Sequence, residues 1–320
     1  MIPISQSTCA KLLRELDPSM KSKPCAVWRI VLPAVAALAW CAGALAQTDA
    51  RLERARGEIE KRIQASGADV AIAFRTLDGK LEWHVRADEP FHAASTMKVP
   101  VMIELFSQVK EGKARLDEPL VVRNEFHSIV DGSAYSLDAA DDSENELYKA
   151  AGQTRTLEQL CEAMISVSSN LATNLLIEKL GVENIQKTVG ALHAEGMNVL
   201  RGVEDEKAYE KGLNNTTTAR GLEVLLEAIA EGKAVDGEAS RQMVEILERQ
   251  KWNEAIPAGL PPGTAVAHKT GEITKIHHDA AIVYAKRPFV LVILVRGMAD
   301  SKASAALMAD ITRALFQAVE

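Results

Sequence analysis

The spacing of apolar and polar residues changes twice along this chain. Apolar positions recur at helical spacing over residues 48–66, and strict alternation then predicts a hairpin, with strands at 69–76 and 81–86 around Asp78-Gly79. The last third returns to strand-like alternation. It predicts three strands and a closing amphipathic helix, over residues 264–269, 279–284, 289–296 and 301–319.

The middle of the chain is mainly helical. Residues 95–232 show helical spacing, most clearly over 156–180, whereas the acidic stretch 138–153 predicts a surface loop. Because strands come from both ends, we expect an α+β fold: an antiparallel five-stranded sheet flanked by terminal helices, plus an inserted all-helical domain. The α/β part would comprise about 47–94 and 233–320, and the helical part about 95–232. A site lined by both parts would lie in the cleft between them.

The first 46 residues predict a segment that is removed. Arg29 precedes an apolar run over residues 30–40, and the segment closes on Ala44-Leu45-Ala46, a pattern that signal peptidases accept. We interpret residues 1–46 as a secretory signal peptide and expect the protein in the periplasm or outside the cell. Two alternatives stay open. The run is short for a retained membrane anchor, and Cys41 offers a site for lipidation.

Net charge and cysteine content narrow the range of possible function classes. The chain has a formal net charge of −7, and the leader contributes five basic but only two acidic residues, so the remainder is more acidic still. Such a surface repels nucleic acid. Three of the four cysteines lie in the leader, which leaves Cys161 without an internal disulfide partner. Its apolar helical surroundings indicate a buried structural thiol.

Three short motifs carry the candidate chemistry. Ser95-Thr96-Met97-Lys98 lies at the predicted start of a helix, where residues three apart share a face. The Lys98 amine could therefore take the Ser95 proton, once burial or neighbouring cations lower its pKa. Alone, this tetrapeptide also fits a helix cap followed by a solvated lysine. Ser168-Ser169-Asn170 and Lys269-Thr270-Gly271 follow it in that order.

With these three motifs in order, the chain resembles the class A β-lactamase-related serine hydrolases, a penicillin-recognising family, from about residue 50 to the C-terminus. The resemblance implies a β-lactamase/transpeptidase-like catalytic domain over residues 47–320. Ser95 would be the nucleophile, Lys98 its base, and Ser168 the relay that carries a proton to the leaving nitrogen. The residues that it assigns to substrate binding are Asn170, Lys269, Thr270 and Gly271, and it implies no cofactor.

The second motif and the loop after Leu200 depart from that family's pattern. Ser169 replaces the aspartate that is usual between the serine and the asparagine. The loop is shorter and lacks the usual Glu-Pro-x-Leu-Asn core. Arg201 and a Thr-Thr element match, whereas Asn215 stands where the aspartate that closes the loop is expected.

The identity of the base that activates the deacylating water is therefore open. Glu204 is the first candidate and Glu206 the second. The alternative is that both are solvated acids on a loop, which is the usual state of a surface carboxylate. Asn174 matches the family's asparagine that supports this loop, which favours Glu204.

The adjacent histidines His277 and His278 do not predict a metal site. Consecutive strand residues point to opposite faces, and no cluster of Cys, Asp or Glu completes a ligand set, so we expect no metal. By resemblance, His277 falls near an arginine that supports carboxylate binding in the family.

Three functions remain open at this stage. The first is a secreted class A-type β-lactamase that acts through an acyl-Ser95 intermediate. The second is a D,D-peptidase or esterase-like hydrolase of the same fold with slow β-lactam turnover, and the third a non-catalytic β-lactam sensor. The expected partner is a small β-lactam or peptidoglycan-like substrate, and we expect a monomer with no nucleic-acid partner and no stable membrane insertion after cleavage.

Overall fold

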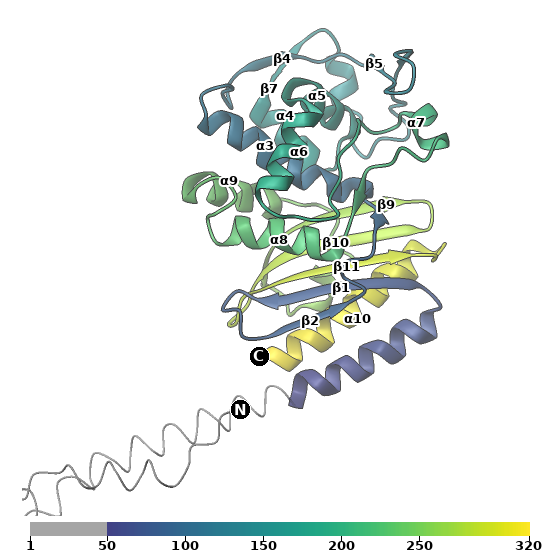
Figure 1. Ribbon diagram of the computed structural model, residues 1–320, viewed down its shortest axis with the longest axis vertical. Coiled ribbons are helices and arrows are strands. Elements are labelled where there is room, and N and C mark those ends of the chain that lie inside the picture. The colour runs from purple at the N-terminus through teal and green to yellow at the C-terminus, as the bar shows by residue number, and fades with distance from the viewer. Residues whose placement is uncertain (1–49) are drawn as a thin grey trace, which may run out of the picture. The chain divides into compact units, whose positions relative to one another are not determined.

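Five strands of the described chain form one antiparallel sheet, in the order β2-β1-β11-β10-β9 (Figure 1). They are β1 (Asp69–Thr76), β2 (Glu82–Val85), β9 (Ala265–Ile273), β10 (Ile276–Tyr284) and β11 (Phe289–Arg296). The three central strands are buried along most of their length, which fits their β-branched and aliphatic composition. The predicted fold class is confirmed.

This computed structural model describes residues 50–320, of which residues 55–320 form one compact unit. The predicted signal peptide, with three of the four cysteines, lies outside the described residues. Cys161 is buried and free, and burial raises the pKa of its thiol, so it stays protonated. None of the helices in the described part combines the length and apolar character that crossing a membrane requires.

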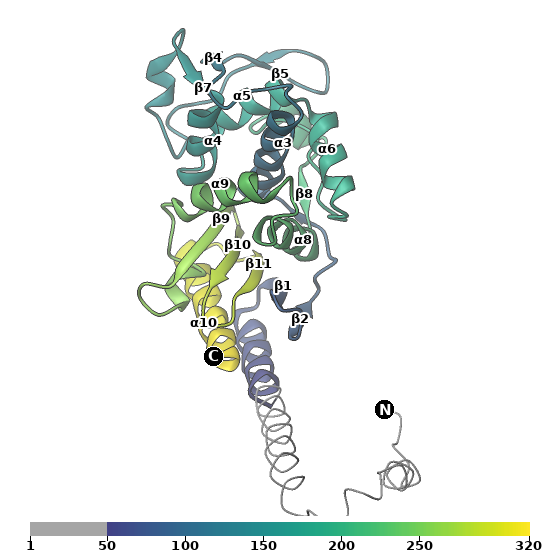
Figure 2. The same ribbon diagram turned by 90° about the vertical axis from the view of Figure 1, so that its left-hand side faces the viewer.

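Helices cover both faces of the sheet (Figure 2). Residues 50–66 are helical, and Arg62 pairs with Asp310 of α10 (Ser301–Val319), which packs on β10 and β11. On the other face α8 (Ala219–Ala230) packs on β1, β10 and β11, and α9 (Gly237–Glu248) contacts β9. The apolar residues of α8 recur at helical spacing and are buried; they are Leu222, Leu225, Leu226 and Ile229. This helix packs on the sheet although it lies within the range predicted for the helical part.

The helical part is built around α3 (Lys98–Lys110), which is buried on nearly all sides. The other helices of this part are α4 (Leu157–Ser166), α5 (Asn170–Leu180), α6 (Val182–Ala191) and α7 (Glu206–Glu210). Short strands and 3₁₀ helices connect them: β3 (Phe91–His92), η2 (Ala94–Met97), β4 (Pro119–Val121), β5 (Phe126–His127), β6 (Ala134–Tyr135), η3 (Leu147–Ala150), β7 (Thr154–Thr156) and β8 (Thr216–Thr217). A further 3₁₀ turn, η4 (Pro257–Gly259), precedes β9. The stretch 156–180, where helical spacing is clearest, forms two helices, because Thr156 and Ser169 each cap a helix start with their side chains.

The strands β9 and β10 are longer than predicted. Gly271 pairs with His278 and Glu272 with His277, so the ladder continues past Lys269. Gly271 and its polar neighbours interrupt the apolar alternation, which is why the pattern alone ends the strand early. The third motif therefore lies inside an edge strand.

Candidate active site

Ser95 lies in a tight turn that is pressed against the edge strand. It belongs to η2, and α3 begins three residues later at Lys98. A Cβ atom on Gly271 would lie 3.0 Å from the Ser95 nitrogen and 3.1 Å from the Thr96 nitrogen. Only glycine allows β9 to pass this close. The N–H of Ser95 thus lies at a helix start beside the third motif, a position from which a backbone N–H can stabilise negative charge.

Lys98 is fully buried and faces the second motif. Its Nζ donates to the carbonyl oxygen of Ser168 at 2.7 Å, to Ser168 Oγ at 3.1 Å and to Asn170 Oδ1 at 2.9 Å. Burial lowers the pKa of Lys98 to about 7, although the carboxylates of Asp142 and Glu204 act in the opposite direction. The amine can therefore lose its proton near neutral pH and then accept another.

Ser168 stands between two buried lysines. Lys269 Nζ donates to Ser168 Oγ at 3.0 Å and to the carbonyl oxygen of Thr270 at 2.9 Å. Burial and the nearby Lys98 hold the pKa of Lys269 well below its ordinary value. The backbone of Ser168 is left-handed, with φ of 63°, a conformation that costs free energy in a non-glycine residue. A hydroxyl bonded on both sides to amines is suited to pass a proton between them.

Asn170 joins Lys98 to Glu204. While its Oδ1 accepts from Lys98, its Nδ2 donates to Glu204 Oε1 at 2.7 Å. Burial raises the pKa of Glu204, and this hydrogen bond opposes the rise. Glu206, the second candidate base, is exposed in the first turn of α7. The structure thus brings Glu204 into contact with the motifs and leaves Glu206 at the surface.

The loop that carries Glu204 is fastened by amide side chains. Asn174 Oδ1 accepts from the Val203 N–H at 2.6 Å, and its Nδ2 donates to the Val203 carbonyl at 3.0 Å. Asn215 Oδ1 accepts from the N–H of Arg201, and its Nδ2 donates to the Arg201 carbonyl. The Arg201 guanidinium donates to the backbone carbonyls of Leu213 and Gly202. Hydrogen bonds from Asn215 and Arg201 to backbone groups therefore close the loop, although Asn215 stands in place of the aspartate that closes it in the family.

The sequence predicts a surface loop over the acidic stretch 138–153, but one of its side chains belongs to the site. Asp142 turns inward, and its carboxylate accepts from the backbone N–H groups of Asn170 and Leu171. Sequence analysis missed this residue. The sequence carries no signal that separates Asp142 from the other acids of the same stretch, and only its contact with the start of α5 identifies it.

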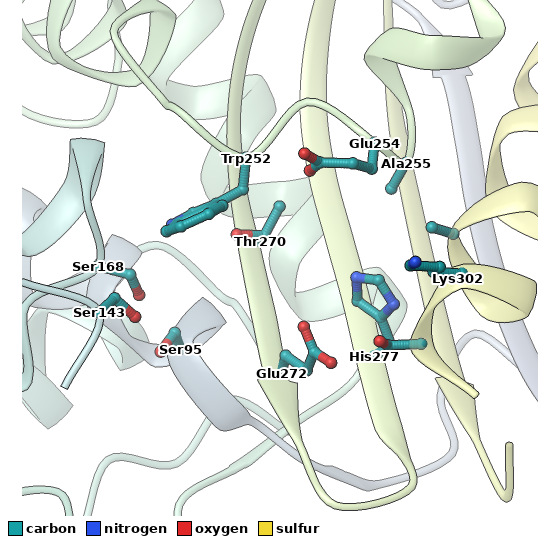
Figure 3. A pocket seen from close by; sticks show the side chains of 12 residues that line it. Ser95, Ser143, Ser168, Trp252, Glu254, Ala255, Thr270, Glu272, His277 and Lys302 are labelled. Atoms are coloured by element: carbon teal, nitrogen blue, oxygen red, sulfur yellow. The ribbon is translucent and has the colours of Figure 1, made fainter. Parts of the chain in front are cut away.

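A cavity of about 350 Å³ opens beside Ser95 (Figure 3). Ser95, Ser168 and Thr270 line it, and so does His277, which the resemblance places near the substrate carboxylate. The other lining residues lie outside the motifs; they include Trp252, Glu254, Glu272 and Lys302. The two adjacent histidines diverge, since His277 Nδ1 lies 2.7 Å from Ser304 Oγ whereas buried His278 bonds to the His92 carbonyl. Within residues 50–320 no group of three or more His, Cys, Asp or Glu side chains is placed to hold a metal ion.

Comparison with known proteins agrees with this geometry. Residues 54–319 match the model of the β-lactamase enzyme family. A β-lactamase of Bacillus licheniformis is 30% identical over 171 residues, which are 51% of this chain and 56% of that relative, so the match spans little more than half of the relative's length.

Solved structures show the same fold. The β-lactamase of Sphaerobacter thermophilus is 26% identical, with a TM-score of 0.68, over 86% of this chain and 96% of that chain. An L158E mutant of PBP-A, solved as an acyl-enzyme complex with penicillin G, is 24% identical, with a TM-score of 0.71, over 83% of this chain and 96% of that chain. At that identity the likeness shows the fold alone. The family match covers the sheet, the helical part and all three motifs, and the chain belongs to the β-lactamase enzyme family.

Proposed function

We propose that this protein is a serine β-lactamase of the class A type, which opens the β-lactam ring through an acyl-Ser95 intermediate. The observation that carries the proposal is the chain of contacts from buried Lys98 through Asn170 to Glu204. One end of the Asn170 side chain contacts an amine with a pKa of about 7, and the other end contacts a half-buried carboxylate. These are the two bases that acylation and deacylation require.

Acylation uses the first of these bases. Ser95 Oγ attacks the carbonyl carbon of the lactam while Lys98 takes the hydroxyl proton. The C–N bond then breaks, and Ser168 passes a proton to the ring nitrogen and is reprotonated by a neighbouring lysine amine. The product is an ester on Ser95 with an opened ring.

Deacylation uses the second base. Glu204 takes a proton from a water molecule, and the hydroxide attacks the ester carbonyl. The ester C–O bond breaks, the released Ser95 oxygen regains a proton, and the β-amino acid leaves. In substrate binding, Thr270 would donate to the substrate carboxylate with support from Lys269.

The secreted or periplasmic location is part of the same proposal. It rests on the charge and apolar pattern of residues 1–46. The N-terminal sequence of the protein purified from its native host tests it, with cleavage before Gln47 as the expected result.

One incubation tests the activity. The protein is mixed with benzylpenicillin, and its intact mass and the opening of the ring are followed together. We expect a transient adduct on Ser95 and many ring openings per protein molecule, and neither with Ser95→Ala, which removes only the nucleophile. An adduct on the Ser95→Ala protein would refute the assignment of the nucleophile.

A D,D-peptidase or esterase-like activity is the second candidate. Two observations favour it: the loop of Glu204 is shorter than the family pattern, and amide groups close it instead of an ion pair. A shorter loop that is closed in a different way would hold the deacylating water in a different place, and a small misplacement costs much of the rate. A lasting penicillin adduct without turnover, together with release of D-alanine from a peptide ending in D-Ala-D-Ala, would select this function over the first.

A further inference from the structure

Asp142, a residue outside the three motifs, contacts the site at the start of α5. A helix leaves its first N–H groups without partners inside the helix, and here each of the first four has an acceptor. Ser169 serves two of them, through its Oγ to Ala172 N at 3.3 Å and its carbonyl to Thr173 N at 3.2 Å. Asp142 serves the other two: its Oδ2 lies 2.9 Å from Asn170 N and 3.0 Å from Leu171 N, and its Oδ1 lies 3.0 Å from Asn170 N.

The loop aims this carboxylate. Tyr148 Oη donates to Asp142 Oδ2 at 2.9 Å, and the Glu144 N–H donates to Oδ1 at 3.3 Å. Glu144 in turn accepts from the N–H groups of Glu146 and Leu147 at the start of η3. Burial and the adjacent Asp142 charge raise the pKa of Tyr148, so its hydroxyl remains a donor. A side chain held by two donors while it accepts from two helix N–H groups has little freedom to move.

Asn170 is the residue through which this anchor reaches the chemistry. Its backbone N–H is held by Asp142, while its side chain contacts both Lys98 and Glu204. A shift of the first turn of α5 would lengthen both side-chain contacts together. The family's second motif ordinarily carries its own aspartate, and this chain has Ser169 there, whose hydroxyl reaches Ala172 only.

We propose that Asp142 is a positioning residue for acylation of Ser95: from a separate loop it anchors the first turn of α5 and so fixes Asn170 between Lys98 and Glu204. The inference rests on the proposed function for its kinetic consequence. Its structural basis, the anchored first turn of α5, is measurable without any substrate.

Asp142 acts on Lys98 by charge as well as by position. The charged groups that face Lys98 are Asp142 from this loop, Glu204 from the loop after Leu200 and Lys269 from β9. Loss of the Asp142 charge would lower the pKa of Lys98 further, because that carboxylate favours the protonated amine. A merely structural residue would slow acylation without moving its pH midpoint, so the two effects separate.

The experiment compares the rate of penicillin acylation from pH 5 to pH 9 in four proteins. They are the wild type, Asp142→Asn, Asp141→Asn and Tyr148→Phe. Asp141 is an exposed neighbour, so its variant makes the same change of charge without the contacts to α5. Amide hydrogen exchange over residues 168–176 is measured in parallel.

We expect Asp142→Asn to slow acylation on the order of 10²-fold, the usual effect of a misplaced catalytic group. We also expect its acid midpoint to lie below that of the wild type and the N–H groups of Asn170 and Leu171 to exchange faster. Asp141→Asn should match the wild type. Tyr148→Phe keeps the carboxylate and loses one donor, so it should give a smaller slowing with an unchanged midpoint, and it supplies the test if Asp142→Asn does not fold.

The contrary results are equally specific. If Asp142→Asn and Asp141→Asn behave alike in rate, midpoint and exchange, Asp142 has no positioning role. A slower Asp142→Asn with the wild-type midpoint leaves it a structural acceptor and overturns the electrostatic part. If the wild type itself forms no adduct, the proposed function fails, and unchanged exchange in Asp142→Asn would still overturn the anchoring of α5 independently.

Discussion

The buried Lys98 should make the free energy of unfolding of the protein depend on pH. Its pKa falls from 10.5 to about 7 on folding, so between these values the unfolded chain binds more protons than the folded one. Stability therefore rises with pH in that range. At 1.36 kcal/mol per pKa unit, Lys98 alone should raise the free energy of unfolding by about 2 kcal/mol between pH 7 and pH 9.

Lys98→Met removes this contribution. The variant also leaves the Ser168 carbonyl and Asn170 Oδ1 without a donor, at roughly 1–3 kcal/mol each, so its stability at a single pH is not decisive. Those lost contacts do not titrate between pH 7 and pH 9. The difference in unfolding free energy between variant and wild type should therefore change by about 2 kcal/mol over this range, in favour of the wild type at the higher pH. Lys98→Met also removes the Lys98 charge that lowers the pKa of Lys269, and this changes the difference in unfolding free energy in the same direction.

Urea unfolding at pH 7, 8 and 9 measures this double difference. Lys187→Met, at an exposed position of α6, is the matched control and should stay parallel to the wild type. Parallel curves for Lys98→Met and the wild type would refute the reasoning, because they would show that Lys98 has nearly the same pKa in the folded and unfolded chains.

Three further outcomes are expected. Glu204→Gln should acylate normally and then accumulate the acyl-enzyme, seen as a burst followed by slow turnover, because the amide keeps the shape and loses the base; a burst in Glu206→Gln instead would move the base to the exposed position. Lys269→Ala should raise the KM of substrates with a carboxylate more than that of neutral esters, whereas equal effects would limit Lys269 to supporting Ser168. Glu272→Gln should lower the KM of anionic substrates, since its carboxylate lines the same cavity as Thr270 (Figure 3); an unchanged KM would show that the Glu272 carboxylate does not repel the bound substrate.

The sequence predicts the fold well where the apolar periodicity agrees with the positions of turn and helix-capping residues. The predicted limits of β1, β11 and α10 match the structure, because turn residues bound the two strands and Asp300 caps the helix. They fail at β9, where Gly271 and Glu272 are polar or small but still pair with β10. Periodicity reports side-chain burial, whereas the ladder is made by the backbone.

The residues of the site likewise fall into those that the sequence predicts and those that it does not. Motif order predicts the residues that the structure brings together: Ser168 bonds to both Lys98 and Lys269, and Ser95 lines the same cavity as Ser168. Each motif has a fixed local geometry on its own helix or strand. The inward turn of Asp142 was out of reach. Several acids follow one another in that loop, and only the contact with a helix start 28 residues away distinguishes this one.

The pairing of β1 with β11 has a consequence for synthesis. Asp69 and Arg296 lie 227 residues apart in sequence and are neighbours in the sheet. Loop closure over such a distance is entropically costly, and folds with high contact order form slowly. On the ribosome β1 must wait, with its apolar side chains uncovered, until nearly the whole chain has been made. The nascent protein should therefore depend on chaperones or on rapid release far more than a domain built from local contacts, and a chain truncated before β11 should be degraded instead of retaining partial activity.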